Sequence, residues 1–257
     1  MIDVLTLAGT GERPHFPGRV YGLLSAVTQE LDSDRFASTP VVYPASYGPM
    51  PDWAGIDYES SVQDGLDALV AAIRATDRLV GLIGYSQGAT IVSRLLDELG
   101  AGAFPDIELS FAALVANPHR APGWASIDGS VSGYGIAGAH KPWPTDIPIW
   151  EVANPRDPIC SCPANSPLRG FADLTGRFSI SDPARWGVDL VERALEHSGQ
   201  KWFLQPGWWD ARRAVDDALN YLIRGEHTMY ISAPIGQFAG RTYCQELAHL
   251  INAHVRE

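Results

Sequence analysis

The sequence predicts an α/β fold in which helices flank a central parallel sheet. Apolar, β-prone runs alternate with stretches of helical periodicity through the first half of the chain. Several of these runs end in turns rich in glycine, proline or polar residues. One of them, at 78–85, passes through a glycine-flanked turn straight into a helical pattern. This order is typical of parallel strands joined by right-handed crossovers.

Length and composition indicate one large globular domain, with or without an insertion. The 257 residues are 46% hydrophobic and 19% charged, which are ordinary values for a protein with a substantial core. The net charge of −11 argues against nucleic acid or an anionic membrane surface as the main partner, because phosphates bind basic surfaces. We therefore expect a small neutral or ester substrate.

The sequence shows no targeting or membrane-spanning segment. No apolar run approaches the roughly 18 to 20 residues that cross a bilayer, and the N-terminal run lacks the basic segment of a signal peptide. We expect a soluble protein that is made in the cytoplasm and has no membrane span.

The elements predicted in the first half of the chain alternate between strand and helix. Residues 2–8 form a mostly apolar run, as expected of a central strand covered on both faces. Apolar positions three and four residues apart, from Val62 to Ile73, predict an amphipathic helix. In chain order we expect a strand at 2–8, a helix at 18–31, a strand at 41–44, a surface loop at 45–53, a helix at 59–74 and a strand at 78–85.

The strand at 78–85 ends in the motif Gly84-Tyr85-Ser86-Gln87-Gly88. A Gly-x-Ser-x-Gly motif between a strand and a helix is typical of a nucleophile elbow, in which the serine occupies the tip of a tight turn. Bulkier residues at Gly84 and Gly88 would collide with the strand or the helix. The motif predicts that Ser86 is a nucleophile, and a glycine-flanked loop serine is the alternative.

A glycine-rich turn, Gly9-Thr10-Gly11-Glu12, follows the first strand. It is expected at the carboxyl edge of the sheet, where ligands bind in open α/β folds. We expect the backbone N–H of Thr10 to be one donor of an oxyanion hole. The N–H of Gln87, which follows the nucleophile, is the other. A phosphate-binding loop is the weaker interpretation, because neither Gly-x-Gly-x-x-Gly nor Gly-Lys-Ser/Thr is present.

Two further strands are predicted at 107–116 and 147–153, separated by a long loop over 123–144. Asp157 follows the second of them. A chain ordered Ser, Asp, His places there the acid that holds the imidazole ring. Prolines on both sides of Asp157 make a turn-capping role the alternative.

A serine nucleophile needs a general base near neutral pH, and histidine is the usual one. His227 lies in a loop among small or polar residues and in the right chain order, whereas His119, which follows a strand, is the second choice. The remaining histidines are expected at the surface of predicted helices (His197, His249 and His254) or in loops without a supporting pattern (His15 and His140).

Residues 161–222 differ in composition and have mostly helical patterns. We interpret them as a cap or linker subdomain inserted into a catalytic core made of 1–160 and 223–257, which ends in a helix at 241–254. The tryptophans of the insertion either attach it to the sheet or line a groove for a long apolar chain. They are Trp186, Trp202, Trp208 and Trp209.

The cysteines Cys160, Cys162 and Cys244 are odd in number, so at least one is unpaired within the chain. The first two are too close in sequence for an ordinary bridge, although either could meet Cys244. The lack of a signal peptide favours free thiols.

The elbow with its Tyr and Gln, the run Asp157-Pro158-Ile159-Cys160 and His227 together resemble the cutinase-like serine esterases of the α/β-hydrolase fold. The layout is most similar to the lysin B esterases of mycobacteriophages, which cleave the ester between mycolic acids and arabinogalactan. The resemblance implies a catalytic triad of Ser86, Asp157 and His227. It also implies an oxyanion hole of Thr10 and Gln87, with no metal or organic cofactor.

The same resemblance implies a lipid ester such as mycolyl-arabinogalactan as substrate. It further implies synthesis in a host cytoplasm, action at the mycobacterial envelope during phage lysis, and a monomer. One departure is Arg156, where cutinases usually have glycine before the acid. A broader lipase, carboxylesterase or thioesterase is an alternative, as is a wall-binding protein with a relict hydrolase fold.

Overall fold

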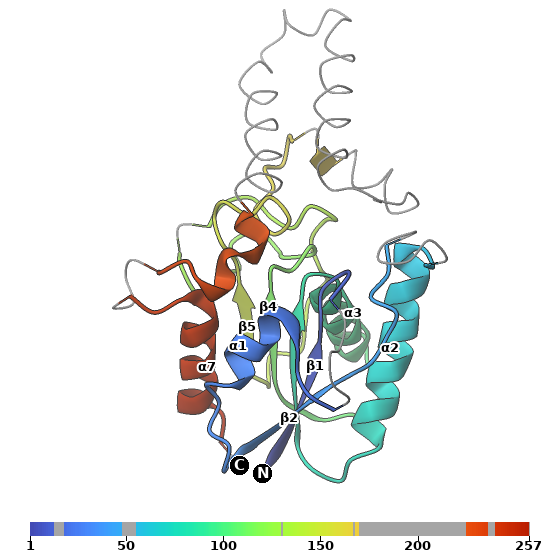
Figure 1. The fold of residues 1–257 in the computed structure, drawn as a ribbon. Coiled ribbons are helices and arrows are strands. Elements are labelled where there is room, and N and C mark those ends of the chain that lie inside the picture. Colours follow the sequence, from blue (N-terminus) through green and yellow to red (C-terminus); the bar gives the residue numbers. More distant parts are fainter. Residues whose placement is uncertain are drawn as a thin grey trace, which may run out of the picture.

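The structure of the chain is a computed structural model, drawn in Figure 1. It describes residues 1–12, 18–47, 55–129, 131–166, 168–169, 225–235 and 240–256. The insertion predicted at 161–222, with its four tryptophans, lies almost entirely outside these residues, as do His15 and His197. No helix in the described part is long and apolar enough to cross a membrane.

Five parallel strands form one sheet in the order β2-β1-β3-β4-β5. The central strand β3 has all six residues buried, which explains its continuous apolar sequence. Because the strands are parallel, their carboxyl ends meet at one edge of the sheet. The prediction of an α/β fold around a parallel sheet is confirmed. The strands are β1 (Ile2–Leu7), β2 (Phe36–Pro40), β3 (Val80–Tyr85), β4 (Leu109–Val115) and β5 (Ile149–Val152).

Helices cover both faces of the sheet (Figure 1), and each face has its own buried apolar cluster. One face carries α2 (Tyr58–Arg74) and α3 (Gln87–Gly100). The other carries η1 (Gly22–Leu24), α1 (Ser25–Thr28), η3 (Glu226–Ile231) and α7 (Tyr243–His254). The side chain of Asp57 caps α2 by accepting the Ser60 N–H, and Thr242 and Gln245 form a capping box that begins α7. The helices predicted at 59–74 and 241–254 are confirmed.

The second strand lies earlier in the chain than predicted. It is β2 at 36–40, paired with β1 from Ile2↔Phe36 to Thr6↔Pro40, and the predicted run 41–44 is not a strand. The Val41 N–H still donates to the Thr6 carbonyl, but the side chain of Val42 is 66% exposed. Beyond this point the backbone turns away from the strand direction, since Ala45 has a φ of 47°.

The helix predicted at 18–31 is also wrong in its extent. Only η1 and α1 are helical, over 22–28. Gly18 and Gly22 have φ values of 71° and 64°, in the left-handed region that interrupts a continuous right-handed helix, so helical backbone begins only at Gly22. The apolar spacing of this stretch places Leu23, Leu24 and Val27 in the core, and two short turns are sufficient to do so.

The long loop predicted between β4 and β5 is confirmed in its described residues. It contains isolated bridges from Ile127 to Val152 and from Tyr134 to Cys162. All three cysteines are buried free thiols. Burial raises the pKa of the Cys244 thiol to about 12, so it is protonated and unreactive at neutral pH.

Candidate active site

Ser86 forms the sharp turn between β3 and α3. Its backbone has φ 54° and ψ −113°, a conformation that costs a non-glycine residue free energy. The Ser86 N–H donates to the Val115 carbonyl at 3.0 Å, and its own carbonyl accepts the Thr90 N–H at 3.0 Å. These two bonds fix the turn against β4 and the first turn of α3.

The glycines of the motif allow backbone segments to approach closely. A Cβ at Gly84 would lie 2.5 Å from the carbonyl oxygen of Gly88, and a Cβ at Gly88 would lie 2.0 Å from that of Leu7. Both contacts are with backbone, which cannot move aside. The expectation that larger residues collide with the strand or the helix is therefore confirmed.

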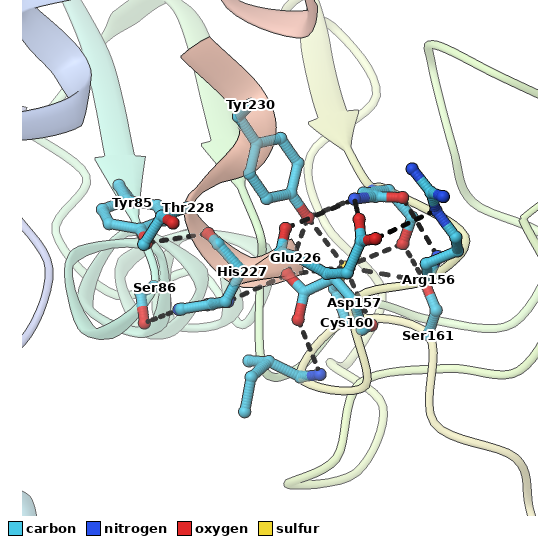
Figure 2. A network of polar contacts seen from close by, with 12 residues as sticks. Tyr85, Ser86, Arg156, Asp157, Cys160, Ser161, Glu226, His227, Thr228 and Tyr230 are labelled. Carbon is cyan, nitrogen blue, oxygen red and sulfur yellow. Dashed lines mark hydrogen bonds and ion pairs between the residues drawn. The ribbon is translucent and has the colours of Figure 1, made fainter. Parts of the chain in front are cut away.

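The structure brings Ser86, His227 and Asp157 into one chain of hydrogen bonds (Figure 2). The Oγ of Ser86 lies 2.9 Å from Nε2 of His227, and Nδ1 of His227 lies 2.9 Å from Oδ2 of Asp157. The imidazole ring thus lies between the hydroxyl and the carboxylate. In this arrangement Nδ1 donates to Asp157 and Nε2 faces the serine hydroxyl, whose proton it can accept.

His227 is held by its backbone and by an aromatic ring as well as by Asp157. It is the second residue of η3, which begins after Gly225 at a φ of 63°. Its carbonyl accepts the Tyr85 hydroxyl at 2.9 Å. The Tyr85 and His227 rings stack with centroids 5.2 Å apart. The residue before the serine therefore helps to place the imidazole.

Asp157 is fully buried, and both of its carboxylate oxygens accept hydrogen bonds. Oδ1 accepts the Ile159 N–H at 3.0 Å. Oδ2 accepts the Tyr230 hydroxyl at 2.8 Å in addition to the imidazole N–H, and the Cys160 thiol lies 3.6 Å from it. Sequence reasoning predicted Asp157 at this position but missed Tyr230 (Figure 2).

The turn after β1 lies beside Ser86. A Cβ on Gly9 would be 3.4 Å from the Ser86 Cβ and 2.8 Å from the Tyr85 ring. The backbone N–H groups of Thr10 and Gln87 have no acceptor within the described part of the chain. The side chain of Gln87 is turned away to donate to the Ser46 carbonyl at 2.9 Å. Both N–H groups are thus available, and their role as oxyanion donors stays a prediction.

Glu12 fixes this turn, and sequence reasoning did not assign it a role. Its carboxylate accepts the N–H groups of Gly9 and Leu23, both at 2.8 Å. A side chain at Gly22 would collide with the carboxylate. Burial raises the pKa of Glu12, while the two backbone hydrogen bonds and the nearby His227 act to lower it. The sequence Gly9-Thr10-Gly11-Glu12 could have indicated this role, because Glu12 ends the turn and its side chain can reach back to the Gly9 N–H.

The other described histidines take no part in this chain of hydrogen bonds. Burial, and secondarily Arg94, lower the pKa of His119 to about 4, so it is neutral near pH 7. His140 stacks on Trp143 with ring centroids 3.4 Å apart. His249 and His254 are exposed on α7, as predicted. Among the described residues, no group of three or more His, Cys, Asp or Glu side chains is placed to hold a metal ion.

Comparison with known proteins supports the fold. Residues 36–154 match the model of the PE-PPE domain. The structure is similar to that of lysin B from Mycobacteriophage D29, with a TM-score of 0.56 and 19% identity over 96% of this chain and 97% of that one. No sequence among curated proteins matches the chain.

Two further solved structures are similar over a smaller part of the chain. An acetylxylan esterase has 22% identity and a TM-score of 0.49 over 68% of this chain and 93% of its own. A cutinase-like protein from Cryptococcus sp. has 18% identity and a TM-score of 0.47 over 62% of this chain and 78% of its own. The match to lysin B, which covers nearly the whole chain, shows the α/β-hydrolase fold.

Proposed function

We propose that this protein is a serine esterase with Ser86 as its nucleophile. The observation that carries the proposal is the hydrogen-bonded chain from the Ser86 Oγ through His227 to Asp157. The strained backbone of Ser86 and the free N–H groups beside it support the same assignment. These are the parts that acyl transfer to a serine requires.

The reaction takes place in two steps. His227 Nε2 removes the Ser86 hydroxyl proton while Oγ bonds to the ester carbonyl carbon, and the N–H groups of Thr10 and Gln87 stabilise the oxyanion. The same imidazole then gives its proton to the departing alcohol oxygen. A water, deprotonated by His227, attacks the acyl-enzyme, and the proton returns to Ser86 as the acid leaves. No step is assigned to a metal or an organic cofactor.

For the substrate we propose the ester between mycolic acids and arabinogalactan, cleaved at the mycobacterial envelope during phage lysis. The similarity of fold to lysin B over nearly the whole chain supports this choice. The sequence resemblance at the elbow and around Asp157 supports it as well. A neutral sugar–lipid ester also suits a protein with a net charge of −11.

Labelling by a fluorophosphonate probe tests whether Ser86 is activated. We expect rapid labelling and hydrolysis of p-nitrophenyl esters by the wild-type protein. Ser86→Ala should lower kcat by at least about 10³-fold, because the nucleophile is lost. Ser93→Ala is the matched control, since Ser93 is a buried serine of α3, the helix that follows Ser86, and should retain wild-type turnover. Full activity in Ser86→Ala would refute the assignment.

Release of free mycolic acids from purified mycolyl-arabinogalactan tests the substrate. Release that disappears in Ser86→Ala supports the envelope esterase. Hydrolysis of simple esters without mycolate release instead indicates a broader lipase, carboxylesterase or thioesterase. A wild-type protein that neither labels nor hydrolyses any ester is better described as a wall-binding protein with a relict hydrolase fold.

A further inference from the structure

We propose that Tyr230 is a positioning residue of the active site, which holds the carboxylate of Asp157 and limits the negative charge that Asp157 presents to His227. The inference rests on the proposed triad. It adds a residue that acts on the histidine through the acid and touches neither the substrate nor the serine. Figure 2 shows Tyr230 directed at Asp157 from the same short helix, η3, that carries His227.

The surroundings of the Tyr230 oxygen determine where its proton lies. The Asn154 N–H donates to this oxygen at 3.1 Å, so that contact uses a lone pair. The Oδ2 of Asp157 lies 2.8 Å away, and a carboxylate oxygen accepts hydrogen bonds but cannot donate them. The Cys160 sulfur at 3.2 Å is a much weaker acceptor. The phenol proton is therefore donated to Asp157.

Tyr230 remains a donor over the whole working range of pH. Its side chain has no exposed surface, and burial together with the nearby Asp157 raises the pKa of the phenol well above its ordinary value. The phenol is therefore protonated near neutral pH, and it can donate its proton to Asp157 there.

Two donors share one oxygen of Asp157, and this sharing has a consequence for His227. The phenol withdraws part of the negative charge on Oδ2 that would otherwise stabilise the protonated imidazole. Among the described residues, the groups that face His227 or Asp157 include the carboxylate of Glu12, the Tyr85 ring and the Cys160 thiol. The charged side chains of the adjacent residues Arg156 and Glu226 pair with each other at 3.3 Å. Burial and the charge of Asp157 raise the pKa of Cys160, so the thiol adds no charge. Tyr230 thus supplies a second donor to Oδ2 of Asp157, beside the imidazole.

The test replaces only the phenol oxygen. In Tyr230→Phe we expect the acid limb of the kcat/KM profile to move to higher pH by about half a unit or more, because more charge on Asp157 favours the protonated imidazole. The plateau of kcat/KM should fall roughly tenfold, since the carboxylate loses a hydrogen bond that orients it. Tyr243→Phe is the matched control: Tyr243 packs edge-on against Tyr230 and bonds to Asp128, away from the acid.

A role that is only structural would lower activity without moving the acid limb, and an unmoved limb in folded Tyr230→Phe overturns the proposal. The same variant is then combined with Asp157→Asn. Because Tyr230 acts through Asp157, its substitution should have no further effect on kcat/KM in that background, whereas a multiplicative loss would contradict the proposal.

Proton NMR of the His227 ring separates this inference from the proposed function. The pH at which the ring protonates should rise in Tyr230→Phe and stay unchanged in Tyr243→Phe, whether or not the protein hydrolyses esters. A shifted ring in a protein without esterase activity would refute the function and retain the Tyr230 interaction. An active enzyme whose ring titration is the same in both variants would refute the role of Tyr230 alone.

Discussion

Ser86 combines a strained backbone with the reactive hydroxyl. At φ 54° and ψ −113° a residue with a Cβ is in a region that glycine tolerates much better. The strain is maintained by the hydrogen bond from the Ser86 N–H to Val115 and by the close approach of Gly88 to Leu7. The turn therefore stores free energy that keeps the hydroxyl exposed to His227.

This strain can be measured by comparing two inactive variants. Ser86→Ala removes the hydroxyl but keeps the Cβ, whereas Ser86→Gly removes both. We expect Ser86→Gly to be more stable to unfolding than Ser86→Ala by about 1 kcal/mol, because relief of strain exceeds the greater entropy of glycine in the unfolded chain. Urea denaturation gives the difference. An alanine variant that is the more stable of the two would show that this turn is relaxed.

The residues of the site differed in how far the sequence could predict them. The Gly-x-Ser-x-Gly motif identifies Ser86 locally, and chain order points to Asp157 and His227. Tyr230 has no such signal, because its partner Asp157 is 73 residues away and a tyrosine three positions after a histidine is unremarkable. Its role depends on which loops the sheet brings together, and only the structure supplies that information.

At the scale of elements, hydrophobic periodicity located α2 and α3 well, because each has one face against the sheet. It misplaced β2, since an edge strand with the sequence Phe-Ala-Ser-Thr-Pro is less apolar than the run that follows it. What decides the pairing there is the hydrogen-bond register with β1. Composition could not provide that register.

The loops at the carboxyl edge are held together by a buried arginine. Arg120 is only 1% exposed, and its guanidinium donates solely to backbone carbonyls among the described residues. One bond reaches Cys160, next to the acid loop, at 2.7 Å. The other acceptors belong to the loop that follows β4, and they are the carbonyls of Ala121, Trp124, Ser132 and Gly133.

Arg120→Lys should be strongly destabilising although the charge is kept. The three nitrogens of the planar guanidinium reach carbonyls on several sides, whereas a lysine has only one nitrogen. Several buried backbone carbonyls would therefore lose their donor. We expect the free energy of unfolding to fall by about 3 kcal/mol, measured by urea denaturation. Arg74→Lys is the control, because Arg74 is half-exposed and pairs with Asp106 at the surface, and its unfolding midpoint should not change. An equally small effect at Arg120 would mean that water or a neighbour replaces the lost bonds.

At the scale of the whole molecule, the parallel sheet assembles a site from distant parts of the chain. Ser86 follows β3 and Asp157 comes after β5, and η3 carries His227, 141 residues after Ser86, to the same site. The turn after β1 reaches the same edge. Strand direction therefore explains why the segments after β1, β3 and β5 meet at this edge, and the residues of each segment then determine the chemistry.

The net charge of the molecule is a further property that acts on the site as a whole. With 30 acidic and 19 basic side chains the chain carries a net charge of −11, and its field repels anions at low salt. We expect kcat/KM for an anionic ester, such as mono-p-nitrophenyl glutarate, to rise several-fold between about 10 mM and about 500 mM NaCl, as the Debye length shortens from roughly 30 Å to a few ångströms. The kcat/KM for the neutral p-nitrophenyl butyrate should show no such change, and that for a cationic choline ester should show the opposite one.

If kcat/KM for the anionic ester did not depend on salt, basic groups near Ser86 would be offsetting the global charge. The expected result would favour neutral sugar–lipid esters over polyanionic thioesters as substrates. The measurement therefore also bears on the choice between an envelope esterase and a thioesterase.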